Sequence, residues 1–131
     1  GQDNRVKLPS GRWISYFNCR AMETNSDWPQ YFGSITRGAA PRNFYGGKLC
    51  ENLIQATARD VFADCYYRML KAGYDVIWTV HDEFIVECDE DKASETQKRV
   101  GEIMLETAKE FNPDMKKMAV ESAITDKWEK V

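Results

Sequence analysis

The chain has 131 residues, of which 43% are apolar and 30% are charged, a composition typical of a single globular domain with a buried core. No apolar run reaches the roughly 18 residues that a membrane-spanning helix needs, and the N-terminus lacks the apolar segment of a signal peptide. We therefore expect a soluble, cytoplasmic protein that does not bind membranes. Gly1 resembles a residue left by tag removal, which would make the chain a piece of something longer.

The net charge of −3 argues against a protein that coats nucleic acid by charge alone. Residues 1–72 hold 10 basic and 6 acidic side chains, whereas residues 73–131 hold 8 basic and 15 acidic ones. This division favours a first part that faces phosphates and a second part whose acids hold a divalent metal ion. The four cysteines form no CxxC pair, and the chain has a single histidine, so we expect no zinc site. We expect all four to be reduced residues that pack in the interior. They are Cys19, Cys50, Cys65 and Cys88.

The first third of the chain predicts a hairpin followed by a long connection. Residues 5–19 alternate in polarity on either side of Pro9-Ser10-Gly11, a tripeptide suited to a tight turn. Residues 20–47 contain scattered glycines, prolines and aromatic residues without a sustained period, which predicts a loop. Since compact domains seldom carry so long a loop, we expect this one to lean on a partner, a ligand or another part of the same protein.

A long helix is predicted over residues 48–72, because apolar side chains recur there at helical spacing and Gly73 stands at the C-cap position. Its predicted buried face consists of Leu49, Leu53, Ile54, Thr57, Ala58, Val61, Phe62, Cys65 and Met69.

The rest of the chain predicts a second hairpin, a second helix and a last strand. The hairpin covers residues 74–88 and bends at His81-Asp82, the helix covers residues 90–112, and the strand covers residues 118–125. The order of elements indicates an α+β fold, in which an antiparallel sheet is backed by two long helices.

The sharpest motif is VHDE, residues 80–83, which lies between two apolar strands. His-Asp is a poor choice for a two-residue turn, where Asn-Gly or Asp-Gly is favoured, and such a departure from local preference suggests a functional requirement. An aspartate at a rigid hairpin tip can hold a divalent ion for phosphoryl transfer. The alternatives are a solvated turn without function and an HD-type phosphohydrolase, but the latter needs several histidines and this chain has only His81.

Two segments taken together resemble a known family. YGGKLCENLIQATARD at residues 45–60 and VHDEFIVE at residues 80–87 are closely similar to family A (polymerase I type) DNA polymerases, especially those of phages and prophages. LPSGR at residues 8–12 resembles the strand before this helix in the phage-type enzymes, and VESAITDKW at residues 120–128 resembles the family's closing strand. The resemblance implies the C-terminal palm segment, with the hairpin as motif C.

The resemblance also implies roles for single residues. Asp82 would bind both Mg²⁺ ions of a two-metal site, Glu83 would assist the shell of metal-bound water, and His81 would contact the primer end. The helix would lie along the minor groove of the primer-template, with DNA contacts from Gln55, Asn52, Lys48 and Arg59. In the family the asparagine lies four residues before the glutamine, whereas here Asn52 lies three before Gln55. A solvated helical glutamine is the alternative for Gln55.

The family's other metal-binding aspartate lies in a DYSQ-like motif A, and its nucleotide-binding residues lie on the fingers helix of motif B. Neither segment occurs in this sequence. The resemblance therefore implies a DNA-directed DNA polymerase as the intact protein, acting on primer-template DNA and deoxynucleoside triphosphates, and an isolated chain that is inactive. Two other classes remain open from the residues alone: a non-catalytic nucleic-acid-binding module and a docking domain.

Overall fold

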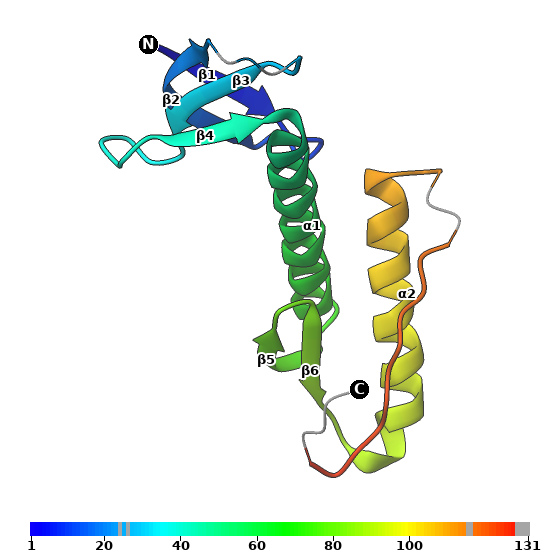
Figure 1. Ribbon diagram of the computed structural model, residues 1–131. Coiled ribbons are helices and arrows are strands. Elements are labelled where there is room, and N and C mark those ends of the chain that lie inside the picture. Colours follow the sequence, from blue (N-terminus) through cyan, green and yellow to red (C-terminus); the bar gives the residue numbers. More distant parts are fainter. Residues whose placement is uncertain (24, 26, 115–116, 128–131) are drawn as a thin grey trace. The chain divides into compact units, whose positions relative to one another are not determined.

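The computed structural model describes residues 1–23, 25, 27–114 and 117–127. It has the predicted α+β class, with antiparallel strands and two long helices (Figure 1). The chain divides into two compact units, Gly1–Arg59 and Asp60–Val131, where composition predicts a single domain. No helix of the described residues is long and apolar enough to cross a membrane.

The first unit contains a four-stranded antiparallel sheet in the order β1-β2-β3-β4. The strands are β1 (Gln2–Lys7), β2 (Trp13–Met22), β3 (Gln30–Ser34) and β4 (Arg42–Tyr45). The predicted hairpin of residues 5–19 is present as β1 and β2. Its turn is closed by hydrogen bonds from the Leu8 amide to the Arg12 carbonyl at 2.7 Å and from the Gly11 amide to the Leu8 carbonyl at 2.9 Å. Gly11 has φ +89°, which explains a glycine at this position.

The long loop predicted for residues 20–47 is interrupted by strands, which take up nearly half of it. β2 continues to Met22, and β3 and β4 pair so that Tyr31 lies opposite Phe44 and Phe32 opposite Asn43. The aromatic side chains favour strands, and cross-strand pairing stabilises them, although the glycines and prolines between them hide the alternation in the sequence. The loop prediction fits the described residues between β2 and β3, which are 23, 25 and 27–29, and residues 35–41 between β3 and β4.

The core of the first unit lies on one face of this sheet. Leu8, Tyr16 and Phe44 are buried there, and the rings of Tyr16 and Phe44 meet edge to face with centroids 5.4 Å apart. From β4 the chain continues directly into helix α1 (Gly46–Lys71) (Figure 1).

Helix α1 confirms the predicted helix and its C-cap. The Gly73 amide donates to the Leu70 carbonyl at 3.0 Å and the Tyr74 amide to the Met69 carbonyl at 3.1 Å, the two bonds of a Schellman motif, with Gly73 at φ +86°. The predicted buried face was wrong at Ile54, which is 61% exposed, and at Ala58, which is also exposed. A helix this long buries only the stretches that meet a neighbour, so periodicity alone marks too many positions.

The second unit combines the last turns of α1 with β5 (Asp75–Val80), β6 (Glu83–Glu87), the 3₁₀ turn η1 (Glu90–Lys92) and α2 (Ala93–Phe111). This confirms the second hairpin and the second helix, whose first turn is 3₁₀. Its core is formed by Cys65, Met69 and Ile103. Burial raises the pKa of the Cys65 thiol, so Cys65 packs as a neutral apolar group, as expected. Cys50 and Cys88 are exposed, so the expectation that all four cysteines pack in the interior was wrong for these two.

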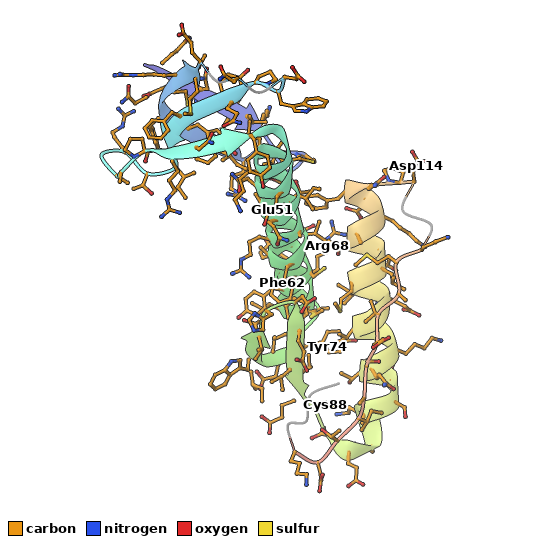
Figure 2. All side chains as sticks on the ribbon, viewed as in Figure 1. Glu51, Phe62, Arg68, Tyr74, Cys88 and Asp114 are labelled. Atoms are coloured by element: carbon orange, nitrogen blue, oxygen red, sulfur yellow. The ribbon has the colours of Figure 1, made fainter. Side chains whose placement is uncertain are left out.

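Arg68 joins the two helices of this unit. Its Nη1 donates to Glu110 Oε1 at 2.8 Å and its Nε to Asp64 Oδ2 at 3.0 Å; Arg68 is labelled in Figure 2. The hydrogen bonds from Arg68 hold the pKa of the exposed Glu110 carboxyl below its usual value. Any stability from this lowered pKa is present above the unfolded pKa and is lost as the pH falls through the folded one.

The strand predicted for residues 118–125 does not form. The described residues 117–127 are irregular and run beside α2 (Figure 1), where Gln97 Nε2 donates to the Ser122 carbonyl at 3.1 Å and to Ser122 Oγ at 3.0 Å. Met118 and Ile124 remain 41% and 52% exposed. The apolar residues that predicted a strand therefore neither pair with a sheet edge nor form a buried face.

Met69 tests the core of the second unit, because its side chain is fully buried. We expect Met69→Ala to lower the free energy of unfolding by about 2–5 kcal/mol, the usual cost of truncating a buried methionine. Chemical denaturation followed by far-ultraviolet circular dichroism measures this. The neighbouring Leu70 is 46% exposed, so Leu70→Ala serves as the matched control and should cost clearly less. Equal losses in both variants would contradict the assigned core.

Candidate functional site

The candidate site begins at the tip of the β5–β6 hairpin. The closing pair is Val80 opposite Glu83, which leaves His81 and Asp82 as a two-residue turn. His81 has φ +52°, a conformation that is uncommon for residues other than glycine, although histidine, asparagine and aspartate adopt it more often than most. Both turn residues are exposed, and Glu83 is half-buried. The three predicted catalytic residues are thus consecutive, and Asp82, one of the two predicted metal ligands, is exposed.

The hairpin is anchored directly below this tip. Phe84, the residue after Glu83, stacks on Phe62 of α1 with ring centroids 4.0 Å apart and planes within 6°, and it lies parallel to Tyr66 at 6.4 Å. Figure 2 labels Phe62 on α1. Farther down, the register shifts between Val76 and Trp78, a bulge that raises the local twist of β5. The tip is therefore carried on a packed element rather than on a free loop.

The donor set at the tip suits a hard cation such as Mg²⁺. Carboxylate oxygen is the ligand that Mg²⁺ prefers, and this ion is usually held by one or two carboxylates while keeping several waters. Asp82 and Glu83 supply that number. Nowhere in the described ranges do three His, Cys, Asp or Glu side chains converge as in a closed metal site. The two carboxylates at the tip therefore suit part of the coordination shell of a metal ion, not a complete shell.

The four predicted DNA-contact residues lie on helix α1 within the first unit. Lys48, Asn52, Gln55 and Arg59 are spaced by four, three and four residues, so they share one face of the helix. Gln55 and Arg59 are exposed. Lys48 Nζ forms an ion pair with Glu51 at 2.8 Å, and this hydrogen bond raises the pKa of the lysine.

The sheet fixes part of this helix face. Asn52 Nδ2 donates to Tyr16 Oη at 3.3 Å, so the amide is oriented by a core residue. Arg12 Nη2 donates to the Ala56 carbonyl at 3.1 Å, in the middle of the same helical stretch. Sequence reasoning missed this role of Arg12, although the LPSGR segment that contains it was singled out. A helix carbonyl that accepts from a distant side chain leaves no signal in the sequence.

The predicted site residues thus fall into two groups, one in each compact unit. His81, Asp82 and Glu83 come together at the hairpin tip of the second unit, and the four residues of α1 form one face in the first unit.

Comparison with known proteins relates the chain to a DNA polymerase. The DNA polymerase of Bacillus phage SP02 is 40% identical over 87 residues, which covers 63% of this chain. The match covers 13% of the length of the phage polymerase, so the chain spans a small part of that relative. No protein-family model matches the chain, and no solved structure matches it.

His81 tests the geometry of the turn. Asparagine adopts positive φ more readily than histidine, whereas a β-branched residue does so poorly. We expect His81→Asn to leave the free energy of unfolding unchanged or slightly raised, and His81→Val to lower it by about 1–2 kcal/mol. Denaturation of the two variants beside the parent chain measures the difference. If His81→Val were as stable as His81→Asn, the left-handed turn would be refuted.

Proposed function

We propose that the chain is the C-terminal palm segment of a family A DNA polymerase, and that its hairpin is motif C of the polymerase site. The observation that carries this proposal is the exposed Asp82 carboxylate at the tip of a hairpin anchored through Phe84 and Phe62. Such an anchor meets the main requirement of a metal-ligand aspartate, a carboxylate ordered before the ion binds. The similarity to the phage polymerase supports the same function.

In the intact protein, the primer 3′-hydroxyl would attack the α-phosphorus of an incoming deoxynucleoside triphosphate. The new phosphodiester bond forms as the bond to pyrophosphate breaks, and the hydroxyl proton passes to solvent. Two Mg²⁺ ions, when bound, would stabilise the charge on the attacking and leaving oxygens. Asp82 would hold both ions together with a second carboxylate from motif A, Glu83 would orient metal-bound water, and His81 would contact the primer end.

The α1 face would contact the primer-template in its minor groove. The groove presents hydrogen-bond acceptors at similar places for all base pairs, so an amide there can sense duplex shape without reading sequence. Gln55 is exposed and available for this role, while Asn52 is held by Tyr16. Lys48 and Arg59, at the two ends of the face, would contact phosphates and fix the register.

Asp82→Asn in the full-length protein tests the metal role. The substitution keeps the size of the side chain but removes its negative charge, and we expect the rate of primer extension to fall at least about 100-fold with the fold unchanged. Single-turnover extension of a labelled primer measures the rate. Asp89→Asn is the matched control, because Asp89 is an exposed acid of the same unit that pairs with Lys92 at 2.7 Å. An Asp82→Asn rate equal to that of the control would rule out Asp82 as a metal ligand.

The 131-residue chain alone should not extend a primer, because one aspartate and its neighbouring glutamate cannot fix two ions and no motif B residue is present to hold the triphosphate. Extension by the purified chain, free of other polymerases, would refute this assignment of roles.

A further inference from the structure

The four-stranded sheet of the first unit has a second face, opposite its core. Cross-strand pairing puts Lys7 beside Trp13 and Arg20 beside Phe32 on this face. Tyr16 and Phe44, which pack together in the core, belong to the other face. We call this second face the open sheet face. Its basic and aromatic members are Arg5, Lys7, Trp13, Phe17, Arg20, Phe32 and Tyr45.

A bulge in β2 gives the open sheet face one of its cations. The register shifts between Phe17, which pairs with Ser34, and Arg20, which pairs with Phe32. Asn18, inside the shift, has φ +52°. In a regular strand Cys19 would share the face of Phe17, but the extra residue places Arg20 there instead. Bulges commonly re-aim a side chain in this way.

The aromatic rings of this face are accessible and accompanied by cations. Trp13, Phe32 and Tyr45 are 51%, 39% and 54% exposed. The Arg5 guanidinium lies 5.3 Å and the Lys7 ammonium 5.9 Å from the centroid of the Trp13 ring. Exposed rings with cations beside them match a ligand that carries both flat bases and phosphates.

The positive charge of the open sheet face favours a ligand with phosphates over an apolar protein partner. The one acidic residue within the four strands is Asp3, which pairs with Arg37 at 3.0 Å and accepts from the Asn18 amide at 2.9 Å. Arg5, Lys7 and Arg20 therefore leave the face positively charged. An apolar partner would have to desolvate these cations without compensation, whereas phosphates would neutralise them.

We propose that the open sheet face binds single-stranded DNA, with bases stacked on Trp13 and Phe32 and phosphates held by Arg5, Lys7 and Arg20. The binding would be independent of base sequence, because every base has a stacking face. It is separate from the proposed minor-groove contacts of α1 and does not depend on the metal role of Asp82.

Titration of the 131-residue chain against a fluorescein-labelled 20-nucleotide oligothymidine, followed by anisotropy at several NaCl concentrations, tests this. Three phosphate contacts predict a slope of about −2 for log K against log salt, since each contributes about 0.7 on a single strand. Trp13→Ala should weaken binding about 5- to 100-fold through lost stacking, and Trp13→Tyr should restore most of it. Arg20→Ala should reduce the slope by about 0.7.

Two variants in the second unit are controls. Trp78 is 66% exposed on β5, so Trp78→Ala removes an exposed tryptophan elsewhere, and Asp89→Asn removes an exposed acid that pairs with Lys92. Both should bind the oligonucleotide at least as tightly as the parent chain. The proposal is overturned if the folded parent chain does not bind, or if Trp13→Ala binds like the parent. It is also overturned if Trp78→Ala loses as much affinity as Trp13→Ala, or if a blunt duplex binds equally tightly without dependence on Trp13.

Discussion

The stack of Phe84 on Phe62 is the contact on which the candidate metal site depends. It joins the strand after the turn to helix α1, and the buried cluster of Cys65, Met69 and Ile103 supports the same helix from within the unit. A turn held only by its own two strands would be marginally stable. Packing of Phe84 instead orders the backbone next to Asp82, so the carboxylate of this proposed ligand is exposed on an ordered turn.

In the first unit, the two faces of the four-stranded sheet differ in what they contact. One face of its sheet packs the Tyr16 and Phe44 rings and orients Asn52 on α1, and the other face carries exposed rings and cations. Strand alternation assigns residues to these faces, and the bulge at Asn18 changes the assignment once, in favour of Arg20. Contact to the helix and the proposed contact to single-stranded DNA are thus divided between the two sides of one sheet.

Much of this fold could be predicted from local patterns. The period of α1, the C-cap at Gly73 and the alternation around His81-Asp82 are local signals, and each element is present. The strands β3 and β4 escaped prediction because pairing between distant residues, rather than the segments themselves, stabilises them. The opposite error occurs where an apolar pattern predicts burial or a strand but no neighbouring element covers it. This is the case at the exposed Ile54 and in segment 118–125, which pairs with no strand. Within the candidate site, the VHDE residues could be identified from the sequence. The hydrogen bond from Arg12 to the Ala56 carbonyl of α1 could not.

The most direct measurement of the central claim is paramagnetic broadening of amide signals when Mn²⁺ is titrated into the isotopically labelled chain. Mn²⁺ takes oxygen ligands as Mg²⁺ does and broadens signals close to it. The account predicts that the amides of His81, Asp82 and Glu83 broaden first, and that Asp82→Asn abolishes this local effect. Broadening centred on the acidic turn of η1, with residues 81–83 unaffected, would contradict a metal site at the hairpin tip.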